Sequence, residues 1–448
     1  MNKLTRENVQ GVLTEHGLAE LKIFLEDAHP ADIALLIEEL DEREQLLTYR
    51  VLRKDVAAEA FSQMSLTDQT KIFDALDEFE EKELFERLET DDAVDFLEEL
   101  PANMVRRLLR ACSPERRTVL NHFLNYAPES AGSVMTDIPL IFNVDMSVGE
   151  ALQRLREDRT TAITFGTLYV TSEDRILLGV LSLRELLHSQ DEALLKDVMQ
   201  TNVISVHTNE DQQEASLLIM HYDFQALPVT DSENRLVGVI TVDDAMDILE
   251  LEASEDMELI AGVQPQEVTY RELSAWEQAK RRIPWMSILM VSGLFNGVIL
   301  GQFEAAFVAL PILVTFIPML TDTGGNAGSQ TTTLIIRGLA TQNLTRKDLK
   351  MVLWKELKTA VLVSMPLIIL VIIRSLFIEP YDAWIGVVTG LAMACIIVMS
   401  KLLGALLPML SERIGIDPAL MAGPVITTVV DALGLVIYFG LAILFLGL

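Results

Sequence analysis

Five long apolar runs toward the C-terminal end constrain the fold more than any other feature of this sequence. They cover residues 284–303, 305–322, 358–378, 384–410 and 417–446. A helix needs about 20 apolar residues to cross the ~30 Å hydrocarbon core of a bilayer. We therefore predict a transmembrane α domain of five helices over residues 283–448, embedded in a lipid bilayer.

The formal net charge of −31 lies entirely before these runs. From Ile283 onward nine acidic and nine basic residues cancel, so the preceding 282 residues carry the whole excess. Basic residues cluster before the first run and between the second and third, and such clusters stay on the cytoplasmic side. We expect a multi-pass protein of the cell membrane with its N-terminus in the cytosol and its C-terminus outside. The first residues lack the apolar core of a signal peptide.

Asp431 is the single charged residue between Pro418 and the C-terminus. An ionised aspartate at the bilayer centre costs about 2.5–3.5 kcal/mol. Its carboxyl group could serve as a hydrogen-bond partner between helices, or it could line an ion or proton pathway. Mg²⁺ keeps several waters and is usually held by one or two carboxylates, so one aspartate from each of two subunits would suit it. Thr427 and Thr428, one turn earlier, are further pore-lining candidates.

The second apolar run passes into the polar stretch "TDTGGNAGSQ", which contains the pore-lining candidates Asp322 and Asn326. Irregular polar backbone is tolerated at membrane depth only where protein buries it or water fills a cavity. Two interpretations follow. The stretch either lines a cavity in the membrane or is an ordinary cytoplasmic loop that begins at Asp322.

A twelve-residue repeat occupies residues 20 to about 130. Its equivalent apolar positions are Leu40, Leu52, Met64, Leu76, Leu88 and Leu100. Each unit is long enough for a short helix, and stacked units bury a shared apolar seam. We predict a small α-helical solenoid with acidic outer faces.

A longer duplication follows at residues 131 to about 250. "SVMTDIPLIFNV" recurs as "DVMQTNVISV", and "LLGVLSLREL" recurs as "LVGVITVDDA". Short β-branched runs alternate with helical patterns, which indicates two αβ units. The pair resembles tandem CBS domains, which commonly bind adenine nucleotides. Thr241 and Asp244 match the threonine-then-acid pattern that such sites use for ribose and phosphate.

An acidic helical pattern covers residues 243–262. It contains eight acids and no base, and seven of the acids fall between Asp243 and Asp256: Asp243, Asp244, Asp247, Glu250, Glu252, Glu255 and Asp256. Like charges at this density repel one another, so bound cations would stabilise the helix. The alternative is a solvated acidic face without a ligand.

Motifs along the whole chain resemble those of the MgtE family of magnesium transporters. They are "HPADIALLIEEL", "TVDDAMDILELEASED", "KRRIPW", "TGGNAGSQTTTLIIRGLA" and "DPALMAGPVITTVVDALGLVIYF". The resemblance implies a multidomain chain with a solenoid sensor at 1–130, tandem CBS domains at 131–250, a connecting plug helix at 251–282 and the pore domain at 283–448. It implies a homodimer without enzymatic activity or a nucleic-acid partner. This dimer would take up Mg²⁺, close when cytoplasmic Mg²⁺ is high, and could bind ATP.

The resemblance also assigns roles to single residues. Asp431 matches the pore carboxylate that binds the hydrated ion. Acids that match regulatory Mg²⁺ ligands are Glu59, Asp91, Asp95, Asp211, Asp223, Asp244, Asp247, Glu252, Glu255 and Asp256. Tyr169, Arg184 and Thr241 are candidate nucleotide contacts. Three positions depart from the family pattern: Gln213 stands where an acid can occur, and Ser329 and Gly423 stand where asparagines can occur.

A proton-coupled carrier is also compatible with the sequence, whereas an intramembrane enzyme is not supported by it. A proton-coupled carrier would use Asp431 as a proton relay and the CBS pair as a nucleotide sensor. An intramembrane aspartyl protease would need two carboxylates that share a proton, and we expect Asp322 to lie nearer a membrane edge. There is no P-loop for an ATPase. Oxygen ligands and waters do not by themselves select among Mg²⁺, Co²⁺ and Ni²⁺.

Overall fold

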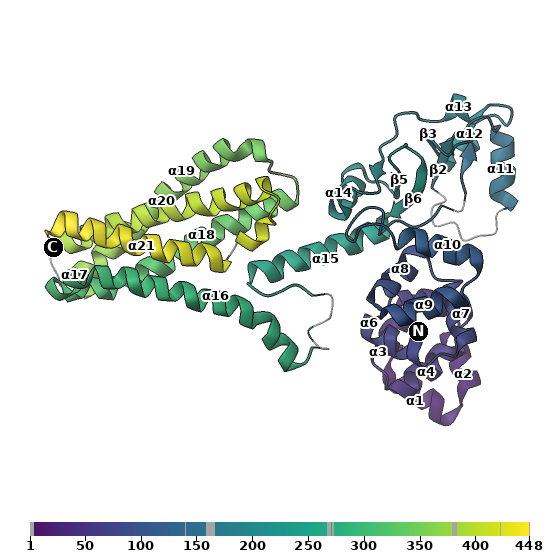
Figure 1. Cartoon of the computed structure of the whole chain (residues 1–448), viewed down its shortest axis with the longest axis horizontal. Helices are drawn as coiled ribbons and strands as arrows, with labels where there is room; N and C mark the ends of the chain where they lie inside the picture. Colours follow the sequence, from purple (N-terminus) through teal and green to yellow (C-terminus); the bar gives the residue numbers. More distant parts are fainter. Residues whose placement is uncertain are drawn as a thin grey trace. The chain divides into compact units, whose positions relative to one another are not determined.

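The computed structural model describes residues 4–138, 140–157, 166–266, 270, 273–378, 383–421 and 423–447. The chain divides into two compact units, Met1–Glu250 and Leu251–Leu448, each described by itself below (Figure 1). The first unit contains the solenoid and the duplicated αβ region, and the second contains the apolar helices.

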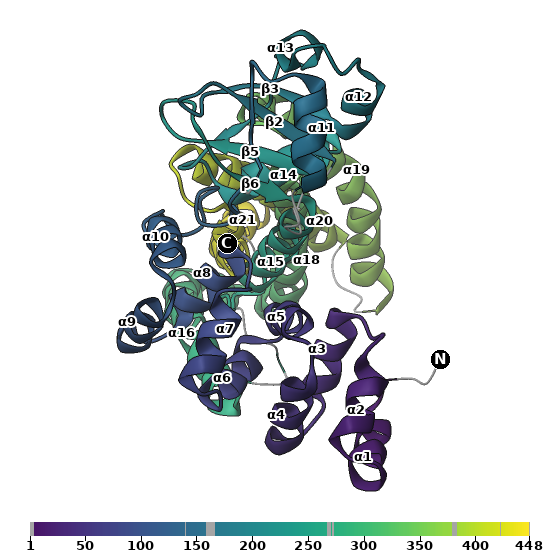
Figure 2. The same cartoon turned by 90° about the vertical axis from the view of Figure 1, so that its right-hand side faces the viewer.

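Within residues 4–138, ten helices form the solenoid (Figures 1 and 2). From α3 onward, each helix begins twelve residues after the previous one, which confirms the predicted repeat. Helices two apart along the chain pack together, for example α3 with α5 and α4 with α6. The bounds are α1 Arg6–Glu15, α2 Leu18–Leu25, α3 Pro30–Glu38, α4 Glu42–Val51, α5 Lys54–Ser62, α6 Leu66–Asp74, α7 Glu78–Phe85, α8 Thr90–Glu99, α9 Ala102–Ala111 and α10 Pro114–Phe123.

Each repeat uses the same positions for capping and for the core. Side chains twelve or twenty-four residues apart accept hydrogen bonds from first-turn amides and so fix the helix starts; among them are Asp41, Ser65 and Asp77. The six apolar positions predicted from the repeat are all buried. Three phenylalanines spaced by twelve, Phe61, Phe73 and Phe85, pack around the ring of Phe96.

The αβ region contains two three-stranded sheets of the same topology, as the duplication predicts. In each sheet a short strand pairs in parallel with the middle strand, which pairs antiparallel with the third. The first half contains β1 Phe142–Asn143, α11 Val148–Glu157, β2 Thr167–Thr171, β3 Leu177–Ser182, α12 Leu183–His188 and α13 Leu195–Val198. The second contains β4 Val206–His207, α14 Gln212–Tyr222, β5 Ala226–Thr230, β6 Leu236–Thr241 and the start of α15 Val242–Ile260.

The segment before each half packs on the other half. Met135 precedes the first half, yet a Cβ at Gly238 of β6 would lie 2.6 Å from its Sδ. Met199 precedes the second half, and a Cβ at Gly179 of β3 would lie 2.5 Å from its Sδ. Both positions therefore require glycine, because each methionine side chain lies too close for a Cβ atom. Since each half receives a methionine from the segment before the other half, these contacts join the two halves.

The second unit contains helices that match four of the five predicted apolar runs. Four are long and apolar enough to cross a membrane within the described residues: Ala275–Gln302, Arg346–Phe377, Ala383–Arg413 and Pro418–Leu446. The bounds are α16 Ala275–Gln302, α17 Glu304–Ala309, η1 Pro311–Phe316, α18 Ile317–Ala340, η2 Arg346–Asp348, α19 Leu349–Ile373, η3 Arg374–Ile378, α20 Ala383–Arg413, η4 Pro418–Met421 and α21 Gly423–Leu446.

The predicted second span, 305–322, is wrong in its bounds. Residues 304–316 form a short helix and a 3-10 turn, and one continuous helix, α18, covers Ile317–Ala340. The stretch "TDTGGNAGSQ" is thus helical, neither irregular backbone nor a loop that begins at Asp322. Glycines usually weaken helices, but α18 packs closely against α20 and α21, and small residues permit this packing.

The predicted connecting helix, 251–282, also differs. α15 begins nine residues earlier, at Val242, and ends at Ile260, while residues 275–282 already belong to α16. Gly262, with φ +71°, lies just past the end of α15 and favours helix termination. A Cβ there would lie 2.0 Å from the Trp285 ring, so this glycine also permits close contact with α16.

Candidate functional site

The membrane unit brings two carboxylates together. Asp431 lies near the middle of α21 and is half-buried, and Asp322 lies in the second turn of α18. The two are close enough for the charge of Asp322 to act on Asp431. The sequence placed Asp322 near a membrane edge, so it did not reveal that two acids from different helices share one region.

Close packing of small residues sets the orientation of α18. A Cβ at Gly404 of α20 would lie 2.6 Å from the carbonyl oxygen of Gly328, and the Ser400 hydroxyl donates to the Gly324 carbonyl at 2.5 Å. On the α21 side, a Cβ at Gly325 would lie 3.2 Å from the Thr427 methyl group. One side of α18 is therefore fixed against its neighbours.

The opposite side of α18 is polar and exposed. It carries Asp322, Asn326, Gln330, Thr333 and Arg337, all of which are exposed in the described part of the chain. Their spacing of three or four residues places them on one helix face; we call this the polar face of α18. In a bilayer such a face requires water, an ion or another protein surface.

The threonines before Asp431 are partly exposed, and their hydroxyl protons are already used. Thr427 donates to the carbonyls of Gly423 and Pro424 at 3.0 Å, and Thr428 donates to that of Pro424 at 2.9 Å. Their oxygens can therefore still accept hydrogen bonds, as from the waters of a hydrated cation. A Cβ at Gly423 would lie 2.5 Å from the Ile260 carbonyl, so the end of α15 leaves no room for an asparagine there.

A second group of acids lies in the first unit, where side chains of α8 meet side chains of the first part of α15. Asp91 is buried, its Oδ1 has no hydrogen-bond partner, and Asp244 acts on it electrostatically. Asp244 accepts hydrogen bonds from the Thr241 hydroxyl at 2.5 Å and from its amide at 3.4 Å. Two predicted regulatory residues, about 150 residues apart in sequence, are thus brought together.

The pKa values in this acidic group are raised, chiefly because burial disfavours the charged forms. Desolvation and the charges of Asp92 and Asp244 raise the pKa of Glu89 to about 7. Desolvation likewise raises the pKa of Asp92 to about 6, with a further contribution from Asp244. Burial also raises the pKa values of Asp91, Asp244 and Asp247. A bound cation would neutralise the carboxylates and so reduce the free-energy cost of burying their negative charges.

The sequence missed Glu89 and Asp92 as members of this group. Both lie in the motif "LETDDAVDF", beside the predicted Asp91, and adjacency to three other acids was the available signal. Glu59 is exposed and acts on Glu89, so it joins the group, and Asp95 is exposed on the next turn of α8.

Asp211 and Asp223 lie at opposite ends of α14, about 18 Å apart at 1.5 Å per residue. Asp211 is the N-cap and accepts hydrogen bonds from the amides of Gln213 and Glu214 at 2.8 and 3.2 Å. Asp223 ends the helix with φ +55°. One ion therefore cannot bind both carboxylates of this chain in the observed arrangement.

The remaining predicted acids lie on the second half of α15. Desolvation raises the pKa of Asp256 to about 6, with Asp417, Glu252 and Glu255 adding to the effect and Arg337 opposing it. Leu259 and Ile260 pack against Ile336 of α18 and Ala419 of η4. This end of α15 therefore contacts the helix that carries the polar face.

The nucleotide candidates make separate contacts. Tyr169 is buried against β5 and β6, and its hydroxyl donates to the Ala226 carbonyl at 3.5 Å. Arg184 is exposed on α12, and Thr241 is bonded to Asp244 as above. Tyr169 thus contributes to the interior between the two halves.

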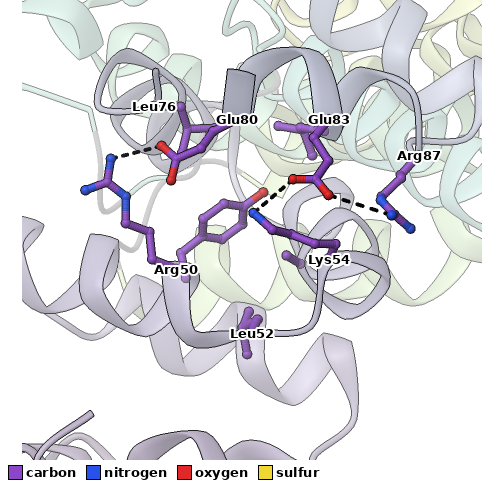
Figure 3. Close-up of a pocket in the computed structure, with 10 residues that line it drawn as sticks. Arg50, Leu52, Lys54, Leu76, Glu80, Glu83 and Arg87 are labelled. Atoms are coloured by element: carbon purple, nitrogen blue, oxygen red, sulfur yellow. Dashed lines mark hydrogen bonds and ion pairs between the residues drawn. The ribbon is translucent and has the colours of Figure 1, made fainter. Parts of the chain in front are cut away.

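Among the described residues, no group of three or more His, Cys, Asp or Glu side chains is arranged to hold a metal ion. One pocket lies in the solenoid, and its cations are already paired: Arg50 with Glu80, and Lys54 and Arg87 both with Glu83 (Figure 3). These pairs tie α4 and α5 to α7.

Together these features define a membrane protein that joins a bundle of apolar helices to a CBS pair and an acidic solenoid. Family models match in the same order. The MgtE intracellular N domain matches residues 28–129, CBS domains match 131–192 and 195–251, and the divalent cation transporter model MgtE matches 317–441.

Relatives match over nearly the whole chain. The magnesium transporter MgtE of Thermus thermophilus is 35% identical over 443 residues, which cover 98% of each chain, and that of Bacillus subtilis is 29% identical over 97% of this chain and 96% of its own. A crystal structure of the cytosolic domain of the Mg²⁺ channel MgtE in complex with ATP is 34% identical, with a TM-score of 0.51 over 54% of this chain and 98% of that chain. This chain belongs to the MgtE family, whose members are transporters.

Proposed function

We propose that this protein transports Mg²⁺ inward across the cell membrane along the polar face of α18. The interaction of Asp322 with Asp431, across the contact of α18 with α21, carries the proposal. Two carboxylates with nearby threonine oxygens suit a cation that keeps its waters. The full-length relatives are named magnesium transporters, which supports Mg²⁺ as the ion.

We propose that two copies form the pathway. Within the described residues nothing covers the polar face of α18, and a second copy related by a two-fold axis would face it with the same polar residues. α18 would then be a fifth crossing helix beside the four apolar ones, with the N-terminus cytoplasmic and the C-terminus outside. Asp431 from each copy would present two negative charges to one hydrated ion.

We propose further that cytoplasmic Mg²⁺ closes this pathway. The acids of α8 and α15 lie close together, and burial and mutual repulsion raise their pKa values. Mg²⁺ would bridge them at high concentration. Because α15 continues to Ile260, beside α18, a shift of this helix would reach the pathway. ATP at the CBS pair would act on the same helix through Thr241 and Asp244, since the related cytosolic domain was crystallised with ATP.

Uptake in cells that depend on added Mg²⁺ tests the pathway. Asp431→Asn and Asp431→Ala should each reduce uptake at least tenfold, whereas Glu304→Gln, an exposed acid on α17, should leave it unchanged. Equal uptake by Asp431→Asn and the parent chain would overturn the pathway. Uptake that collapses with a protonophore but ignores Mg²⁺ would favour the proton-coupled carrier.

A further inference from the structure

A basic surface at the start of α19 has no part in the proposed transport. It consists of six exposed residues from η2 and the first turns of α19: Lys347, Lys350, Met351, Trp354, Lys355 and Lys358. At 3.6 residues per turn these side chains fall within roughly 140° of the helix circumference. They therefore form one face, which we call the basic face of α19.

The acids of this stretch are turned away from the basic face. Asp348 accepts hydrogen bonds from the amide and hydroxyl of Thr345 at 2.9 and 2.8 Å. Glu356 points into the bundle, where it accepts from the Thr331 hydroxyl at 2.9 Å and contacts the Lys401 ammonium at 3.4 Å. Among the described residues, none of the four lysines forms an ion pair. The basic face thus presents four uncompensated positive charges.

The same side of the helix continues as an apolar surface. Leu362, Met365 and Ile369 follow at helical spacing and are 68%, 56% and 58% exposed. Trp354 lies at the transition, 59% exposed, with the Lys358 ammonium 5.1 Å from its ring centre. An exposed tryptophan between lysines and a long apolar surface is typical of the interface between lipid and water.

A phospholipid matches both parts of this surface, with its phosphate at the lysines and its acyl chains along the apolar residues. A second Lys–Trp pair lies at the start of α16, where the Lys280 ammonium is 5.9 Å from the Trp276 ring. An acidic protein surface would match only the lysines, and a neutral lipid would leave their charge uncompensated.

We propose that the basic face of α19 binds the phosphate headgroups of anionic phospholipids in preference to neutral ones. Positive side chains beside a membrane helix attract anionic lipids electrostatically, and the lysine stems can extend toward the headgroups. The site concerns the membrane position of α19 and is independent of which ion is transported.

Quenching by brominated lipids tests the proposal on the full chain in vesicles. Trp354 is made the only fluorescent tryptophan by Trp276→Phe, Trp285→Phe and Trp384→Phe, and brominated phosphatidylglycerol is compared with brominated phosphatidylcholine. We expect about a tenfold stronger apparent association for the anionic lipid, reduced severalfold at high salt. The variant with Lys347, Lys350, Lys355 and Lys358 changed to Gln should bind both lipids equally.

A matched control removes four exposed cations from the first unit, by Lys22→Gln, Arg43→Gln, Arg106→Gln and Arg110→Gln, and should keep the preference. Native mass spectrometry of the parent chain, with all tryptophans present, should show retained phosphatidylglycerol that the four-lysine variant loses. Equal quenching by the two lipids in the parent, or a preference that survives loss of the four lysines, would overturn the proposal. Weak quenching by both lipids would do so too, since protein would then cover the face.

Discussion

Two buried charged residues, Lys401 in the membrane unit and Asp91 in the first unit, differ in the sign of their neighbours. In the membrane unit, the buried Lys401 lies beside Glu356 and Thr331, so positive and negative groups neutralise each other among α18, α19 and α20. In the first unit, the buried Asp91 faces Asp244, and both carry the same sign. The comparison teaches that the charges of the Lys401–Glu356 pair balance each other, whereas the like charges of the acidic group would be neutralised only by a bound cation.

Removal of one partner from the membrane pair should have the largest effect on stability. Glu356→Gln leaves a buried ammonium without its counter-charge, which costs about 3–5 kcal/mol in comparable buried pairs. The melting temperature of the purified chain should fall accordingly. Glu356→Met with Lys401→Met removes both charges and should recover most of the loss; no recovery would contradict the paired-charge interpretation.

Close packing of α18 should give the next largest effect. Gly404→Ala places a methyl group 2.6 Å from the Gly328 carbonyl oxygen, so one helix must move, at a cost of about 1–3 kcal/mol. Gly293→Ala on α16 is the matched control, because its methyl group meets nothing within 4 Å. Thermal melting of both variants in detergent measures the difference. Helix propensity alone would stabilise both variants, because Ala favours a helix over Gly by about 1 kcal/mol, so an equal change in the two would contradict the packing interpretation.

In the acidic group, removal of a charge should stabilise the protein rather than destabilise it. Asp91→Asn removes a buried negative charge, so we expect the first unit to become about 1 kcal/mol more stable without Mg²⁺ and to gain less from added Mg²⁺. Calorimetric melting with a chelator and with millimolar Mg²⁺ measures both changes. Asp27→Asn, an exposed acid on the same solenoid, should change neither. Destabilisation by Asp91→Asn would contradict the interpretation that like charges destabilise the acidic group.

The smallest effect should appear as a dependence on pH. Glu89 and Asp92 have pKa values of about 7 and 6 in the folded protein, above their usual 4.5 and 3.8. The folded state therefore binds more protons than the unfolded state between about pH 4 and 7, and stability falls as pH rises through this window. Without Mg²⁺, the calorimetric melting temperature of the first unit should therefore fall as the pH rises from about 4 to 7. With millimolar Mg²⁺ the decline should be smaller, and a rise with pH in the chelator would contradict the assignment.

Local periodicity predicted the solenoid, the duplicated αβ units and the apolar helices, since each pattern depends on neighbours in sequence. It failed where packing overrode local preference. The Gly-rich stretch of α18 was predicted as irregular or as a loop, because a Gly-Gly pair among polar residues usually marks a turn or loop. The close contacts of Gly324, Gly328 and Gly404 explain why it is helical.

The candidate sites were predicted in part. Asp431 could be found because a lone charge in an apolar run is conspicuous, and Asp91 and Asp244 were found through the family motifs. Glu89 and Asp92 could not be separated from other acids of a chain with 66 of them. Only the packing of α8 against α15 distinguishes a carboxylate with a raised pKa from a solvated one.

By itself the sequence determined where charged and apolar residues lie along the chain. It thereby determined which part is apolar enough to enter a bilayer and which part forms repeated units with charged surfaces. Hydrophobic periodicity encodes this information residue by residue. Tertiary structure alone decided which acids meet, which helix face stays uncovered and which lysines turn outward. Electrostatic and packing energies depend on distances between elements that lie far apart in sequence, and no local pattern specifies those distances.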